Sequence, residues 1–174
     1  MGKPLLASAE APSGMVAPAE ALLEFPLHPK IRQFVEYWLS IKPGELLPGR
    51  RHFDPMAIPA LLSNLWLVDV EREPRLRFRY RLIGTSVARA FAQDSTGRYL
   101  DEAHPEFAKS QIRAYLSEVA ERRLASWRTG RPVFFALQDF LKVERVYLPA
   151  ARDGATIDMI FALTIFLNRH GEEF

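Results

Sequence analysis

The chain has 174 residues, a length that fits one hydrophobic core with short extensions. Its 23 lysines and arginines against 21 aspartates and glutamates leave a formal charge of +2, which gives little support to nucleic-acid binding. The absence of cysteine excludes disulfides, thiolate metal ligands and cysteine nucleophiles, and it is compatible with a cytoplasmic location.

Residues 1–25 are rich in Ala, Pro, Ser and Glu without a sustained period, so we expect a flexible tail. The apolar run near the N-terminus is too short for a signal peptide, and no run reaches the roughly 20 residues that a membrane span requires. A flanking helix is predicted within 26–45, because Pro29 suits a first helical position and apolar residues follow at helical spacing. Pro43 and Gly44 end this helix.

Residues 46–168 are expected to form the main domain, followed by a C-terminal tail at 169–174. The patterns predict strands at 66–70, 78–83, 132–137, 144–150 and 155–167, a short helix from Thr85 or Ser86 to Phe91, and a long helix from Pro105 to Gly130. The last strand is nearly continuous in apolar residues, which is typical of a strand covered on both faces and placed inside the sheet.

The first two strands can be paired residue by residue. Their alternation predicts the pairs Val70–Phe78, Val68–Tyr80, Trp66–Leu82 and Leu67–Arg81. In this register Asp69 lies opposite Arg79, where the two side chains form a cross-strand ion pair.

The order of elements predicts an α+β fold, with a five-stranded antiparallel sheet, helices on one face and an extra N-terminal helix that can cover the other. Several motifs carry a closer likeness: LP before FDP at 47–55, LWLVD at 65–69, FRYRLIGT at 78–85, TGR at 96–98 and LP at 148–149. Over roughly residues 46–167 the chain resembles the stand-alone bacterial PAS domains. The resemblance implies a sensor or interaction module, with no catalytic role and no settled ligand.

Cofactors of other PAS domains can be tested against these residues. Flavin photosensors and chromophore-bearing members need a cysteine, and this chain has none. A haem sensor needs a histidine on the long helix, but residues 105–126 contain none, so haem is disfavoured. The cofactor is unknown. The four histidines show no metal-ligand spacing, so no metal site is predicted.

Two histidine–carboxylate pairs, His52 with Asp54 and Asp101 with His104, have the composition of a general base and its orienting group. Asp54 and His104 each precede a proline, which favours turn and cap roles instead. No catalytic residue is therefore predicted, and the chain is not expected to be an enzyme.

Arginines gather around the first hairpin, at positions 72, 75, 77, 79 and 81. They are compatible with an anion site, although the pairing with Asp69 gives a structural role to Arg79 and leaves Arg81 open.

Aromatic side chains between sheet and helices are expected to border a ligand pocket, with two polar residues as handles. The candidate ligand-binding residues are Tyr80, Phe91, Arg98, Tyr99, Tyr115 and Phe134.

We thus expect a cytoplasmic sensory domain for signal transduction, which binds an unknown small molecule or a signalling protein partner. A homodimer through the N-terminal helix and the sheet is expected, and nucleic acid and membrane are not. Two alternatives stay open: a small cone-shaped α+β enzyme of the lyase or isomerase kind, and an interaction scaffold with a filled core.

Overall fold

The structure of the chain is a computed structural model, which describes residues 14–132 and 142–173. In this part of the chain six strands form one antiparallel sheet in the order β1-β4-β5-β6-β2-β3. The strands are β1 (Gly14–Ala17), β2 (Leu65–Glu71), β3 (Arg77–Ile83), β4 (Ala125–Gly130), β5 (Lys142–Ala150) and β6 (Met159–Leu167). The helices are α1 (Ala19–Leu22), α2 (Pro29–Ser40), α3 (Thr85–Phe91), α4 (Leu100–Ala103) and α5 (Gln111–Arg122). Short 3-10 helices lie at Arg50–His52, Pro55–Ala57, Pro59–Asn64 and Phe107–Lys109.

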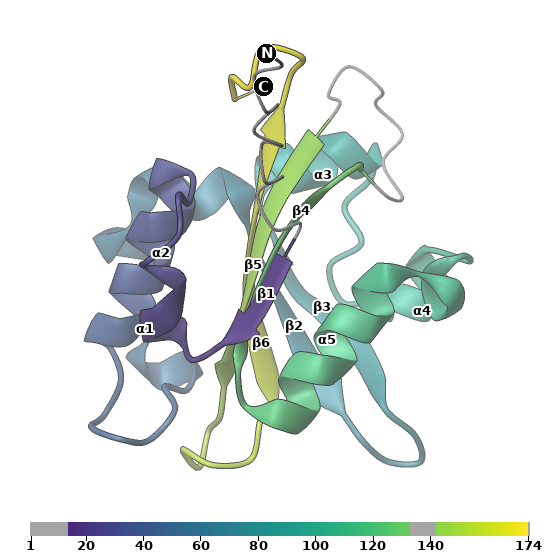
Figure 1. The fold of residues 1–174 in the computed structure, drawn as a ribbon. Coiled ribbons are helices and arrows are strands. Elements are labelled where there is room, and N and C mark those ends of the chain that lie inside the picture. Colours follow the sequence, from purple (N-terminus) through teal and green to yellow (C-terminus); the bar gives the residue numbers. More distant parts are fainter. Residues whose placement is uncertain (1–13, 133–141, 174) are drawn as a thin grey trace, which may run out of the picture.

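Helices cover both faces of the sheet (Figure 1). We call the face under α1 and α2 the outer face, and the face under α3, α4 and α5 the inner face. The predicted α+β class, the helices grouped on one face and the extra N-terminal helix on the other are therefore confirmed. No helix among the described residues is long and apolar enough to cross a membrane.

The N-terminal helix α2 begins at Pro29, as predicted, and His28 Nδ1 accepts a hydrogen bond from the backbone N–H of Lys30. Its apolar stripe is buried against the chain's own sheet, and the Trp38 indole donates to the Pro149 carbonyl oxygen at 3.0 Å. The helix thus fixes the outer face through both apolar packing and a hydrogen bond to β5.

The described part of the expected flexible tail is ordered, which is a correction. Gly14–Ala17 pairs with β4 as a sixth strand, and Ala19–Leu22 forms a helical turn with Leu22 fully buried. The composition of this segment did not predict the strand. A four-residue strand is stabilised by hydrogen bonds to a partner that is distant in sequence, so its own residues carry little pattern.

The predicted long helix was wrong in its second half. Helix α5 ends at Arg122, where Arg123 adopts a left-handed conformation with φ of 59°, and Ala125–Gly130 is strand β4. Pairing with β5 buries Trp127, which outweighs the helical pattern. The strand expected at 132–137 falls almost wholly outside the described residues.

The last two strands follow the prediction closely. They run over Lys142–Ala150 and Met159–Leu167, and Gly154 between them has a φ of +80°. All nine residues of β6 are buried, and β6 lies between β5 and β2. The expected place of this strand inside the sheet is confirmed.

Candidate functional site

A small cavity lies between the inner face of the sheet and the helices that cover it. Its volume is about 10 Å³, which is close to the smallest space that holds one water molecule. The lining residues are Trp66, Tyr80, Val87, Phe91, Leu100, Ile112, Arg145 and Thr164. We call this space the inner-face cavity.

One wall of the cavity carries a buried hydrogen bond between Tyr80 and His104. The Tyr80 hydroxyl and His104 Nε2 are 2.9 Å apart, and the imidazole tautomer decides which of them donates. Burial, aided by the positive charge of Arg98, lowers the pKa of His104 to about 4. Burial raises the pKa of Tyr80. Both groups are therefore neutral near pH 7, and the Phe91 ring lies 4.7 Å from the imidazole between ring centroids.

The strands in the middle of the sheet add polar side chains to the lining of the cavity. Thr164 Oγ1 accepts a hydrogen bond of 3.0 Å from the Trp66 indole, and Arg145 lies directly across from Thr164 in the β5–β6 pairing. Arg145 is 5% exposed, although guanidinium groups are seldom buried. Burial raises the pKa of the neighbouring Tyr147, an effect that the charge of Arg145 partly opposes. A positive charge thus borders a cavity that is otherwise lined mainly by aromatic and aliphatic side chains.

The six residues predicted for the pocket do not all reach it. Tyr80 and Phe91 line the inner-face cavity. Arg98 is exposed and donates to the Glu102 carbonyl oxygen, and the Tyr115 hydroxyl donates to Gln111 Oε1.

Tyr99 also lies away from the cavity, in a network beside β3. Its hydroxyl donates to Glu71 Oε2 at 2.7 Å, and the guanidinium of Arg77 lies 3.6 Å from its ring centroid. Phe134 lies outside the described residues.

Sequence reasoning missed Arg145 and Thr164 as cavity residues. Both interrupt apolar strands, ERVYLPA and FALTIFL, in which every residue is buried. A polar residue inside such a run was the available signal, because burying it requires hydrogen-bond partners.

The histidine–carboxylate pairs have other partners. His52 Nδ1 accepts a hydrogen bond from the Gly49 N–H, and Asp54 caps a 3-10 helix by accepting from the Met56 N–H. Asp101 receives two hydrogen bonds from Arg77, which is the main reason that the pKa of this carboxyl is lowered. The cap role predicted for Asp54 is confirmed.

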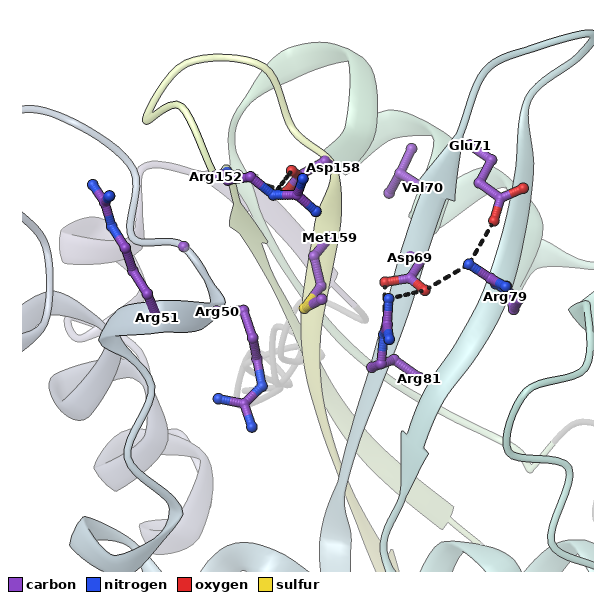
Figure 2. A pocket seen from close by; sticks show the side chains of 11 residues that line it. Arg50, Arg51, Asp69, Val70, Glu71, Arg79, Arg81, Arg152, Asp158 and Met159 are labelled. Carbon is purple, nitrogen blue, oxygen red and sulfur yellow. Dashed lines mark hydrogen bonds and ion pairs between the residues drawn. The ribbon is translucent and has the colours of Figure 1, made fainter.

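The predicted pairing of Asp69 with Arg79 is confirmed, with 3.4 Å between Arg79 Nη2 and Asp69 Oδ2. The expected pairs of Trp66 with Leu82 and of Leu67 with Arg81 were wrong. A bulge shifts the register between Leu67 and Val68, so that Leu67 pairs with Leu82 and Trp66 with Ile83. Arg81 is the extra residue of the bulge and has no partner in the β2–β3 pairing. Its guanidinium forms a diagonal ion pair with Asp69 (Figure 2).

The other hairpin arginines do not form one site. Arg72 donates to the carbonyl oxygens of Ile157 and Ala120, and Arg75 and Arg77 pair with Asp101.

Comparisons with known proteins place the chain. The solved structures that match it include the following two. The first is a sensory box sensor histidine kinase from Vibrio cholerae, with a TM-score of 0.46, 14% identity, and coverage of 65% of this chain and 90% of that one. The second is an RNA-binding Light-Oxygen-Voltage receptor, with a TM-score of 0.47, 11% identity, and coverage of 92% and 40%. The comparison with curated proteins finds no match.

A family model described as a PAS domain matches residues 27–163, which is most of the chain. This range includes α2 and every residue that lines the inner-face cavity except Thr164. The chain belongs to the PAS domain family.

Proposed function

We propose that this PAS domain is a cytoplasmic sensor that binds a small molecule in the inner-face cavity and signals to a protein partner. The proposal rests on one observation: three buried polar side chains gather around the cavity, those of Tyr80, His104 and Arg145. Buried polar groups cost stability unless each is paired, so their gathering at one cavity favours a binding role over mere packing. Fixed donors beside aromatic walls suit a small ligand with polar atoms.

Ligand entry requires the cavity to expand, because about 10 Å³ holds no more than a water molecule. The element most suited to move is α3, which supplies Val87 and the half-buried Phe91 to the lining. Helix α3 ends at Ala92, whose φ of 59° marks a sharp change in chain direction. A ligand that displaces Phe91 favours an open state of α3, and a partner that recognises that state reads the signal.

The interaction scaffold is the second candidate, and the small volume of the inner-face cavity favours it. In that case the domain acts through its surface without a ligand. The hypothesis of a cone-shaped lyase or isomerase loses its basis, because the chain belongs to the PAS family.

The homodimer through the N-terminal helix stays a prediction. The residues Ile31, Phe34, Val35 and Trp38 of α2 are already buried within one chain. A dimer through this helix therefore needs either its polar side or an exchange of helices between copies.

Native mass spectrometry of the purified full chain, beside the denatured sample, tests the sensor against the scaffold. We expect a retained small-molecule mass that is diminished in Tyr80→Phe, which removes only the hydroxyl bonded to His104. Tyr37→Phe is the matched control, because the Tyr37 hydroxyl bonds the Asp54 backbone on the outer side. An apo mass that persists after incubation with a metabolite mixture overturns the sensor and supports the scaffold.

A further inference from the structure

A second hollow lies on the outer face, far larger than the inner-face cavity. Its volume is about 430 Å³, within the range of roughly 300–1,000 Å³ typical of small-molecule sites. The 3-10 helix at Arg50–His52 forms one wall, and strands β2 and β3 form the other (Figure 2). The lining residues are Gly49, Arg50, Arg51, Asp69, Val70, Glu71, Arg79, Arg81, Arg152, Asp158 and Met159. We call it the outer-face groove.

The groove concentrates positive charge. Its lining holds five arginines and three carboxylates, which leaves a formal charge of +2, as large as that of the whole chain. A concave surface with a net positive charge raises the local concentration of anions. The outer-face groove is thus a place where anions gather.

Two of the arginines, Arg50 and Arg51, have further N–H groups that can donate hydrogen bonds to a ligand. Arg50 Nη1 donates to the Phe53 carbonyl oxygen, and Arg51 Nε lies 3.3 Å from His52 Nε2. Within residues 14–132 and 142–173 neither forms an ion pair with a carboxylate. Arg50 stands across from Arg81, with Met159 between them (Figure 2).

The facing wall holds two more guanidiniums in fixed positions. Asp69 is 8% exposed and contacts both Arg79 and Arg81, while Glu71 binds Arg79 at 3.0 Å. Arg79 Nε is buried and has no hydrogen-bond partner in the described part of the chain. The carboxylates orient the two guanidiniums in advance, which lowers the entropy lost when a ligand binds.

The wall that carries Arg50 is also fixed in advance. Backbone hydrogen bonds run from Leu47 to Gly154 and from Ala151 to Pro48, so this loop is tied to the β5–β6 turn. Gly49 permits the close approach, because a Cβ there would lie 2.9 Å from the Ala151 carbonyl oxygen. The groove therefore does not depend on a ligand for its shape.

We infer that the outer-face groove binds a phosphorylated small molecule, with Arg50 holding the phosphate, Arg51 adding positive charge at the rim and Met159 contacting the apolar part. Guanidiniums match the oxygens of phosphate in paired hydrogen bonds and stay charged at all physiological pH values. This site is separate from the inner-face cavity, so either proposal stands if the other fails.

Calorimetric titration of the full chain with inorganic pyrophosphate at low salt tests the inference. We expect saturable binding that weakens by at least about tenfold in the double variant Arg50→Gln/Arg51→Gln, as the loss of charge-assisted hydrogen bonds implies. The control Arg89→Gln/Arg131→Gln removes the same charge from exposed positions outside the groove, and should bind as the wild type does.

Absence of pyrophosphate binding, or equal loss in both double variants, overturns the site. The phosphate of the natural ligand belongs to either a soluble molecule or a lipid headgroup. Co-sedimentation with phosphatidylcholine vesicles that contain phosphatidic acid separates these sources. Binding of pyrophosphate without co-sedimentation supports the soluble ligand, whereas co-sedimentation that Arg50→Gln/Arg51→Gln abolishes assigns the phosphate to lipid.

Discussion

Arg81 Nη2 lies 3.0 Å from Asp69 Oδ2, and Arg81 Nε donates to Asp69 Oδ1 at 3.2 Å, although Asp69 is opposite Arg79 in the strand pairing. The bulge at Arg81 makes this two-point contact possible. Arg79 makes a longer contact of 3.4 Å and divides its guanidinium between Asp69 and Glu71. The diagonal pair is therefore the closer of the two.

Double-mutant cycles should rank these pairs. We expect Asp69→Asn and Arg81→Gln to show a coupling of about 0.5–1 kcal/mol in the free energy of unfolding, because Arg81 is half exposed and its ion pair is screened by solvent. The coupling between Asp69 and Arg79 should be smaller. Urea denaturation at low salt measures both couplings. A larger coupling for Arg79 would contradict the inference that the bulge makes Arg81 the stronger partner of Asp69.

The β2–β3 hairpin shows which features could be predicted from the sequence and which could not. Alternation in FRYRLI predicted the strand, and the pair Asp69–Arg79, because a side-chain period of two fixes the faces. The sequence analysis did not predict the bulge at Arg81. An extra residue leaves the alternation within its own strand unchanged and is defined only by the pairing with the partner strand.

Other misses have the same physical origin. Strand β1 and strand β4 are stabilised by each other and by β5, so their own residues carry little signal. At the site, alternation placed Tyr80 on the cavity side, whereas the side chains of Arg98 and Tyr99 depend on turns at 92–99 that no periodic pattern describes. Arg50 was not assigned to a site, because the groove exists only when the loop meets the hairpin.

The buried His104 should make stability depend on pH. Its pKa of about 4 in the folded chain is below the ordinary value of 6.5. The unfolded chain therefore takes up a proton first as the pH falls. Stability is complete above about pH 6.5 and declines toward pH 4, by roughly 3 kcal/mol from this residue.

Urea denaturation of wild type and His104→Gln between pH 4 and 7.5 measures this decline. The variant should lose this part of the pH dependence, while His170→Gln, at an exposed position, should keep it. Parallel profiles for wild type and His104→Gln would show that burial does not shift the pKa of His104.

Glu144 should anchor the N-terminal segment to the sheet. This carboxylate is 7% exposed, and its Oε1 accepts from the His28 N–H at 2.8 Å and the Trp127 indole at 2.9 Å. Glu144→Ala leaves both donors without their acceptor, and should lower the free energy of unfolding by about 2–4 kcal/mol. Glu144→Gln keeps an acceptor oxygen and should cost less. Thermal and urea denaturation give both values, and equal losses would mean that packing dominates.

Leu100 should control the size of the inner-face cavity. Its side chain is 1% exposed and lines the cavity beside Phe91. Leu100→Ala should lower the free energy of unfolding by about 2–5 kcal/mol, because it removes buried apolar contacts and leaves a larger void. An enlarged apolar void of this kind binds small apolar molecules, so benzene should raise the melting temperature of the variant and leave that of the wild type unchanged.

Leu61→Ala is the control for this experiment, since Leu61 is equally buried but does not line the cavity. It should be destabilised without a selective response to benzene. If Leu100→Ala is destabilised and benzene has no effect, α3 and α4 have collapsed into the space. That outcome would contradict the prediction that the void left by Leu100→Ala stays open.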